Sequence, residues 1–174
     1  MNTQAFVSEL ADARIGTTFN QYAGSALRRE RLAQYLGSRA SARYLFVGEA
    51  AGYRGARVSG LPFTSEHQLT GSGPGEATAT IVQRTLAELG LEEDIVLWNI
   101  VPTHPHRPGE PESNRRPTAS EVREAMRFLE PLVAARRTIA VGRLAEAVLG
   151  GPYVRHPSHG GSAEFRAGLL LSIS

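Results

Sequence analysis

The sequence contains no cysteine and no lysine, and no apolar segment approaches the roughly 20 residues that a membrane-spanning helix needs. The absence of cysteine excludes disulfide bonds, thiolate catalysis and a cysteine-ligated iron–sulfur cluster. The segment 1–16 carries acidic side chains and has no continuous apolar core, so it is untypical of a signal peptide. We therefore expect a cytoplasmic protein that is not anchored in a membrane.

All 19 basic residues are arginines, and they exceed the 17 acidic residues by two. The planar guanidinium group of arginine pairs well with phosphate, because it donates two parallel hydrogen bonds. A GC-rich genome would produce the same preference for arginine over lysine. The composition therefore permits nucleic-acid binding without requiring it, and the placement of individual residues has to decide.

The length of 174 residues predicts a single domain covering 1–174, and an apolar content of 41% is typical of a folded globular protein. Short apolar runs predict buried strands at 44–47, 95–98, 138–141 and 153–155. Between and around them, helical periodicity predicts helices near 3–14, 24–37, 77–89, 118–133, 143–149 and from 162 onward. This alternation predicts a three-layer α/β/α sandwich with a central four-stranded, mostly parallel sheet.

Two long segments, 49–76 and 99–117, are rich in glycine and proline and show little periodicity. Long irregular segments in compact domains are commonly functional. Each follows a predicted strand, and ligands bind at the carboxyl ends of the strands in folds of this kind. The segment 99–117 leads into a helix with a capping box, formed by Thr118 and Glu121. We expect the functional site at this edge of the sheet.

Two polar or glycine-rich features stand at the ends of the first two strands. Gly48 to Gly52 reads GEAAG, which is either a phosphate-binding turn or simply a tight turn. It lacks the GxGxxG spacing and the lysine of nucleotide-binding loops, so no nucleotide cofactor is expected. Asn99 ends a buried strand, where its amide either has a structural hydrogen bond or reads the donor and acceptor groups of a pyrimidine.

Four histidines raise the possibility of a metal site: His104, His106, His156 and His159. The two pairs are about fifty residues apart, and no acidic third ligand stands at a standard spacing from either. We therefore expect no metal. A single histidine such as His156, in the glycine-rich loop HPSHGG, is either structural or catalytic.

Five motifs occur in order between about residue 44 and residue 165: VGEAAG at 47–52, GLPF at 60–63, Asn99 after a strand, NRRPTASE at 114–121 and HPS at 156–158. Together they resemble the motifs of the uracil-DNA glycosylase superfamily. The nearest branch has a GEAPG turn and an iron–sulfur cluster. Two cluster cysteines of that branch correspond to Thr103 and Met126 here, so we expect no cluster and no other cofactor.

Other departures affect the expected specificity. The water-activating aspartate of the GQDPY branch corresponds to Ala50, and its methyl-excluding tyrosine corresponds to Gly52. The leucine that wedges into DNA in that branch corresponds to Gly160. Exclusion of thymine is therefore not implied for this sequence.

The resemblance implies an enzyme that extrudes a nucleotide from DNA and hydrolyses the N-glycosidic bond of uracil or another deaminated base. Phe63 is then expected to stack on the base and Asn99 to read its imide edge. The backbone of the first turn, including Gly48 and Ala50, is expected to line the base site and cover a carbonyl group.

For catalysis, the resemblance implies that His156 donates a hydrogen bond to the departing base and that Glu49 positions or activates water. Phosphate contacts are expected from the loop residues Ser158, His159 and Gly160. Arg115 is either a further phosphate contact or a solvated residue at the start of a helix.

Three alternatives remain open at this point. The chain could bind DNA or a damaged base without excising it, it could be a small-molecule nucleoside hydrolase, or it could be a structural domain without a base-sized pocket. As a glycosylase it would act as a cofactor-free monomer on DNA, in a bacterial-type cytoplasm and associated with the nucleoid.

Overall fold

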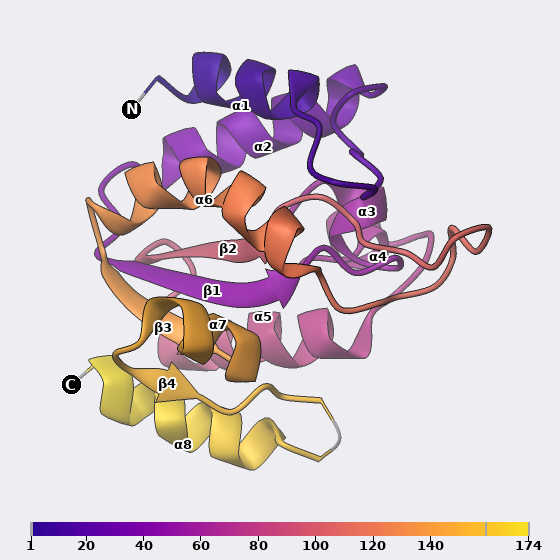
Figure 1. The fold of residues 1–174 in the computed structure, drawn as a ribbon. Helices are drawn as coiled ribbons and strands as arrows, with labels where there is room; N and C mark the ends of the chain where they lie inside the picture. Colours follow the sequence, from indigo (N-terminus) through magenta and orange to yellow (C-terminus); the bar gives the residue numbers. More distant parts are fainter. Residues whose placement is uncertain (1, 159, 174) are drawn as a thin grey trace.

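Four strands form one entirely parallel sheet in the order β2–β1–β3–β4. They are β1 (Tyr44–Ala50), β2 (Ile95–Val101), β3 (Arg137–Val141) and β4 (Tyr153–Val154). The structure is a computed structural model that describes residues 2–158 and 160–173. In Figure 1 the arrowheads of the strands point to the side where the long loops lie, whereas both chain ends lie at the opposite side.

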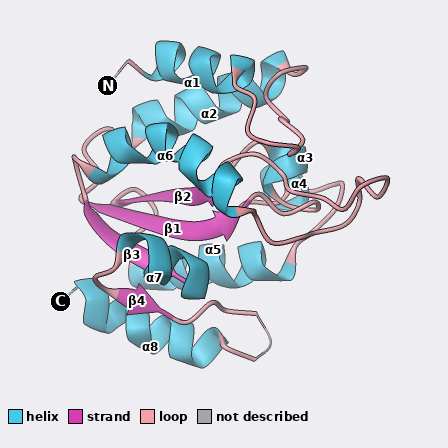
Figure 2. Ribbon diagram, in the orientation of Figure 1, coloured by secondary structure: helices cyan, strands magenta, loops and turns pink. Residues whose placement is uncertain are grey.

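Helices cover both faces of the sheet (Figures 1 and 2). One face is covered by α1 (Thr3–Asp12), α2 (Ala26–Ser38), α6 (Ala119–Val133) and α7 (Arg143–Leu149). The other face is covered by α5 (Ala77–Leu89) and α8 (Ser162–Ile173). The prediction of a three-layer α/β/α sandwich with a central four-stranded sheet is therefore confirmed.

Alternate residues of β1 enter one of two hydrophobic clusters, because successive side chains of a strand point to opposite faces. In β1, Leu45 and Val47 pack toward α1, α2 and α6, whereas Tyr44 and Phe46 pack toward α5 and α8. Burial on both faces explains why the buried residues of β1, β2 and β3 form continuous apolar runs rather than alternating with polar residues.

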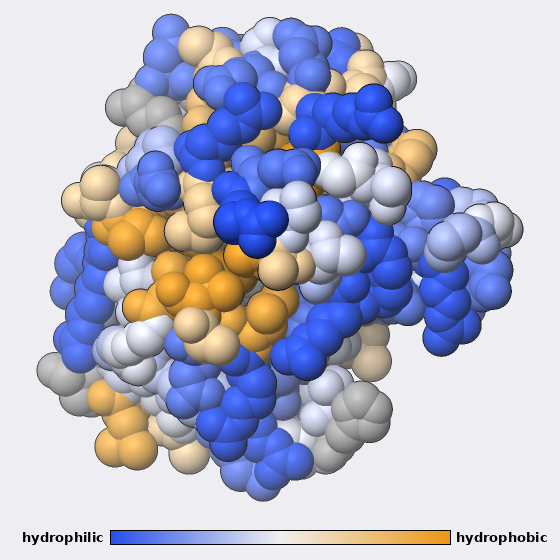
Figure 3. Space-filling model, viewed as in Figure 1, coloured by the Kyte–Doolittle hydropathy of each residue, from blue (hydrophilic) through white to orange (hydrophobic). Residues whose placement is uncertain are grey.

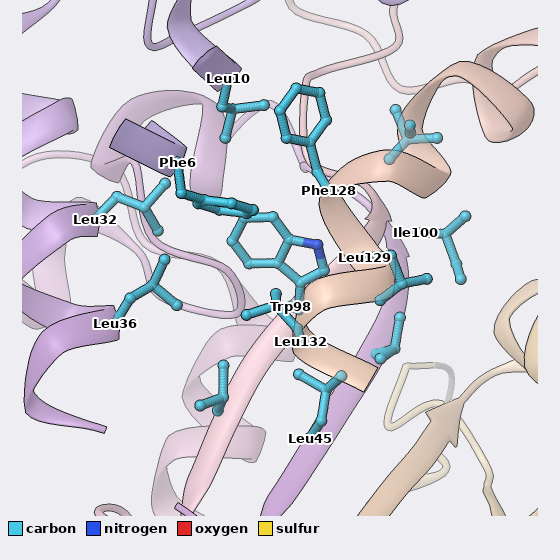
Figure 4. Packing of buried hydrophobic residues seen from close by; sticks show 14 of the residues in the cluster. Phe6, Leu10, Leu32, Leu36, Leu45, Trp98, Ile100, Phe128, Leu129 and Leu132 are labelled. Carbon is cyan, nitrogen blue, oxygen red and sulfur yellow. The ribbon is translucent and has the colours of Figure 1, made fainter. Parts of the chain in front are cut away.

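Trp98 lies at the centre of the larger cluster (Figure 4). Its ring centroid is 5.7 Å from that of Phe6, and Phe6 meets Phe128 edge to face at 5.8 Å. These contacts join β2 to α1 and α6. They stabilise β2. Asn99, which immediately follows Trp98, belongs to the same strand.

The structure refines the predicted elements in three places. Both β1 and β2 run three residues beyond the predicted strands. The segment 49–76 is not wholly irregular, since it contains two short helices, α3 (Ala56–Ser59) and α4 (Glu66–Thr70). Helices this short carry too little periodicity to be recognised in the sequence. The capping box of α6 is confirmed, with the Thr118 side chain accepting a hydrogen bond from the backbone N–H of Glu121.

The surface in Figure 3 is mixed, and hydrophilic residues predominate on the loops at the carboxyl end of the sheet. Apolar surface is visible in the region of α6 and α7, whose partly buried residues include Val122, Met126, Val148 and Leu149. Within residues 2–158 and 160–173, no helix combines the length and the apolar character that crossing a membrane requires.

Candidate active site at the carboxyl end of the sheet

A pocket of about 490 Å³ opens at the carboxyl end of the sheet. This volume lies within the range of about 300–1,000 Å³ that is usual for small-molecule sites. Its walls come from the ends of the strands and from the segments that precede α5 and α6. They are formed by Glu49, Ala50, Ala51, Gly52, Ala56, Phe63, Glu76, Thr78, Asn99, Pro105, Asn114, Arg115, Val141, Gly142, His156 and Ser158.

Asn99 enters the pocket from β2 and is only 4% exposed. Its register partner on β1 is Gly48. A Cβ atom at Gly48 would overlap the ring of Phe63 and would lie 2.9 Å from Oδ1 of Asn99. The missing side chain of Gly48 therefore lets the amide and the aromatic ring approach the same point, although Gly48 itself lies behind them and does not line the pocket.

The side-chain amide of Asn99 has no hydrogen-bond partner within the part of the chain that the structure describes. The amide atoms keep access to the pocket, where water or a ligand can supply their hydrogen bonds. The pocket gives this amide access to a ligand with a complementary donor and acceptor.

Phe63 follows the short helix α3 and has a backbone φ of +50°, the only positive value at a non-glycine position among the described residues. Such a conformation costs on the order of 1–3 kcal/mol and persists where surrounding contacts impose it. Here the ring is buried in the cluster beneath the sheet, and the Phe63 carbonyl accepts a hydrogen bond from Nε2 of Gln83 at 3.1 Å. These contacts fix the direction in which the ring faces the pocket.

His156 reaches the pocket from the loop after β4. Its Cβ would lie 3.5 Å from a Cβ at Gly142, the residue that follows β3. The backbone N–H of Ser158 donates to Nδ1 of His156 at 3.3 Å, and the Ser158 hydroxyl lies 2.9 Å from the same nitrogen. Since Nδ1 accepts the backbone hydrogen, the neutral ring carries its own hydrogen on Nε2 and can donate from there.

Two carboxyl groups line the pocket. The side chain of Glu49 is 40% exposed, and its Oε2 lies 4.0 Å from Nε of Arg116. Partial burial raises the pKa of Glu49, and the charge of Arg116 opposes this effect. The second carboxyl group belongs to Glu76, which the sequence analysis did not identify, because the residue stands in an irregular segment without a motif.

Arg115 lines the pocket but is held by an ion pair with Glu121, whose side chain is 2% exposed. The two guanidinium NH groups donate to the two carboxylate oxygens at 2.8 and 2.6 Å, and Nε donates to the carbonyl of His106. Hydrogen bonds from Arg115 lower the pKa of Glu121 to about 2. This network fixes the loop that precedes α6 against the pocket.

The structure describes two of the loop residues that are expected to contact DNA, Ser158 and Gly160. Ser158 lines the pocket, and Gly160 is exposed with a φ of +78°. His159 lies outside the described residues. A second hollow of about 420 Å³ adjoins the pocket and adds two arginines and a tyrosine to its shared walls: Arg143, Tyr153 and Arg155.

The positions that correspond to cluster cysteines do not suit a metal cluster. Thr103 is buried with its hydroxyl 2.6 Å from that of Thr18, and Met126 packs against the larger core. Within the described residues, no group of three histidine or acidic side chains has metal-binding geometry. His104 instead lies between two backbone carbonyls, with Nδ1 at 2.8 Å from that of Ala51 and Nε2 at 3.3 Å from that of Pro111.

The model of the uracil DNA glycosylase superfamily matches residues 35–170, which include every strand and the whole pocket. The chain belongs to the uracil-DNA glycosylase superfamily. Membership therefore indicates a protein of DNA repair that is a hydrolase of the glycosylase type. The likeness to the iron–sulfur branch of the superfamily stays a prediction.

Among solved structures, the chain is similar to the crystal structure of wild-type SMUG2 from Pedobacter heparinus. The TM-score is 0.73, and the match covers 99% of this chain and 97% of the other at 12% sequence identity. At this identity the likeness supports the superfamily fold and does not transfer a substrate. No curated protein matches the chain by sequence.

Proposed function

We propose that this member of the superfamily hydrolyses the N-glycosidic bond of uracil, or of another deaminated base, in DNA. The observation that carries the proposal is the buried amide of Asn99, which faces a pocket that also contains an aromatic ring and an imidazole. An amide offers one acceptor and two donors, which complement the N–H and C=O groups of an imide edge.

In this mechanism the nucleotide leaves the base stack, because the pocket cannot reach a glycosidic bond inside a duplex. The base stacks on Phe63 and pairs with Asn99, while the backbone at Ala50 lies against it. Asn99 belongs to β2 and His156 follows β4, so they approach from opposite sides of β1 in the strand order. The two side chains therefore contact different edges of the base.

Cleavage breaks the bond between the sugar C1′ and the base nitrogen, and the bonding electrons depart with the base. His156 donates from Nε2 to a base oxygen and stabilises the anion, a contribution of about 2.7–4 kcal/mol for one preorganised donor. Water held by Glu49 forms the new bond to C1′ and releases a proton to this carboxylate. The base anion then takes up a proton from solvent.

DNA is held by the surface around the pocket. Ser158 and the loop after it contact phosphates beside the extruded nucleotide, and exposed arginines near the pocket add positive charge. One chain supplies all the residues that line the pocket, and the proposed enzyme acts as a monomer. No cofactor takes part, and the enzyme acts on chromosomal DNA in the cytoplasm.

A second candidate is a member that binds damaged DNA without cleaving it. It is favoured by Ala50, which lines the pocket at the position where the GQDPY branch has its aspartate. One experiment decides between the two. Oligonucleotides that contain uracil, hypoxanthine or a mismatch, single- or double-stranded, are incubated with the protein, and abasic sites are revealed by alkaline cleavage. Strand cleavage supports the glycosylase, whereas retention in a gel shift without abasic sites supports the binding protein.

A further inference from the structure

Glu76 is a pocket residue at the N-terminal end of α5. It occupies the N-cap position, with an extended backbone at φ −132° and ψ 124°. Capping side chains normally accept hydrogen bonds from the first N–H groups of their helix. The side chain of Glu76 makes no such bond and turns instead toward the loop after β1.

Two glycines of that loop make room for the carboxyl group. A Cβ atom at Gly52 would overlap Oε1 of Glu76, and a Cβ atom at Gly55 would overlap Oε2. Neither glycine has a φ in the left-handed region, and the Glu76 carboxyl group occupies the space that a side chain at either position would take. The loop and the N-terminus of α5 thus enclose the Glu76 side chain beside the pocket.

No cationic side chain of residues 2–158 or 160–173 compensates this carboxyl group. Among the described residues, Glu76 has neither an ion pair nor a side-chain hydrogen bond. Burial raises the pKa of Glu76, and no charged side chain opposes that shift, although the N-terminal end of α5 favours the ionised form. Glu49 differs in this respect, since Arg116 favours its ionised form.

The chemistry of the proposed reaction favours a neutral carboxyl group at this position. A departing base anion would be repelled by a second negative charge inside the same pocket. A protonated carboxyl group instead supplies a hydrogen-bond donor, and burial in an apolar site is a known way to keep such a group neutral. The remaining oxygen of the group can accept a hydrogen bond from a ring N–H.

We propose that Glu76 is a catalytic residue that contacts the extruded base as a neutral carboxylic acid and donates a hydrogen bond to a base oxygen on which negative charge develops. This role rests on the proposed glycosylase activity. Glu76 and His156 then donate separate hydrogen bonds to the base, while the carboxylate of Glu49 holds the water. The ligand class is a base with adjacent C=O and N–H groups, the pattern created by deamination.

The proposal predicts a specific pH dependence. The donor is present when Glu76 is protonated, so its contribution is lost as the pH rises through its raised pKa. The other ionisable groups lining the pocket are Glu49 from β1, Arg115 before α6 and His156 after β4. Tyr53 and Arg54 stand between the two glycines, with the guanidinium 5.3 Å from the ring. The effect of Glu76 must therefore be isolated by substitution.

The test compares E76A and E76Q with the unmodified protein in single-turnover cleavage of uracil and hypoxanthine oligonucleotides, from mildly acidic to alkaline pH. Alanine removes the donor, and we expect a loss of about 100-fold in rate. Glutamine keeps a donor that does not titrate, so E76Q should stay within about threefold of the unmodified protein. It should also lack the part of the decline with rising pH that Glu76 causes.

A surface glutamate of the same helix provides the control. Glu88 lies near Arg84 and Arg166 at the other end of α5, and E88A should leave the cleavage rate unchanged. Thermal unfolding is measured for all variants. Because the partly buried carboxyl group of Glu76 has no hydrogen bond or ion pair among the described residues, E76Q should unfold at the same temperature as the unmodified protein or above it.

The inference is overturned if E76A cleaves at the rate of the unmodified protein. It is also overturned if E76Q is as slow as E76A, because an ionised carboxylate would then be required. Calorimetric binding of free uracil separates this result from failure of the proposed function. A protein that cleaves none of the oligonucleotides is not the proposed glycosylase. An active protein whose E76A variant binds uracil and cleaves normally refutes only the role of Glu76.

Discussion

Gly48 and Asn99 face each other in the register of β1 and β2, and the space left by the missing Gly48 side chain is occupied by the Asn99 amide and the Phe63 ring. Three residues that are distant in the sequence therefore meet at one point. The contact depends on the absence of a single carbon atom. It accounts for a glycine inside a strand, where a β-branched residue would otherwise be favoured.

Replacing Gly48 by alanine should displace both side chains. The added Cβ overlaps the Phe63 ring, and overpacking of this kind typically costs about 1–3 kcal/mol. We expect a comparable fall in the free energy of unfolding in urea and a loss of base binding. Gly37 in α2 has no atom within 4 Å of its added Cβ, so G37A is the matched control and should not destabilise the protein. Equal stability of G48A and the unmodified protein would show that the site is not tightly packed.

Removing the Asn99 side chain should weaken binding of the base more than it destabilises the fold. The amide makes no hydrogen bond to the described protein, so N99A leaves no protein group unpaired. We expect a loss of at least about tenfold in affinity for free uracil, corresponding to about 1.4 kcal/mol. Titration calorimetry measures it. If N99A binds free uracil as tightly as the unmodified protein does, the base does not contact Asn99.

Replacing His156 by alanine should depress single-turnover cleavage by about 100- to 1,000-fold, because one donor to the departing base is lost. The fold should persist, since His156 lies in a loop at the pocket and outside both hydrophobic clusters. His67 is exposed in α4, so H67A should retain full activity. Wild-type rates for H156A, with circular dichroism unchanged, would remove this histidine from the mechanism.

Acid should weaken the fold through Glu121. Its pKa is about 2 in the folded protein against an ordinary value of 4.5, so its stabilising contribution is complete above about 4.5 and declines as the pH falls toward about 2. Substitution E121Q leaves Arg115 without its carboxylate partner and should cost about 3–5 kcal/mol at neutral pH. The variant should also lose this part of the acid dependence, which urea unfolding at several pH values would reveal.

Arginines of the second hollow should strengthen DNA binding through phosphate contacts. Arg143 and Arg155 have exposed ion pairs with Glu146 and Glu164, which are weak enough to be exchanged for phosphate. Each of R143Q and R155Q should reduce the slope of log affinity against log salt by about 1. The control is R127Q on α6, where the arginine pairs with Glu9 of α1. If R143Q and R155Q both show the slope of the unmodified protein, the DNA does not contact this hollow.

Much of the fold follows from the sequence because its signals are local. The apolar run at 44–47 marks a strand buried on both faces, and the Thr118 and Glu121 pair marks the start of α6 within four residues. Both are confirmed. Helices α3 and α4 escaped the sequence analysis, since a single turn has no detectable period.

The sequence by itself determined the layers, the parallel strands and the edge of the sheet at which polar residues gather, because these depend on periodicity and on residues a few positions apart. Only the tertiary structure decided which side chains share the pocket. Glu76 carries no motif, yet the path of two loops brings its carboxyl group onto Gly52 and Gly55. Arg115 looks available for phosphate in the sequence, whereas in the fold Glu121 holds it. Such meetings depend on how distant segments close over the sheet, which no local pattern specifies.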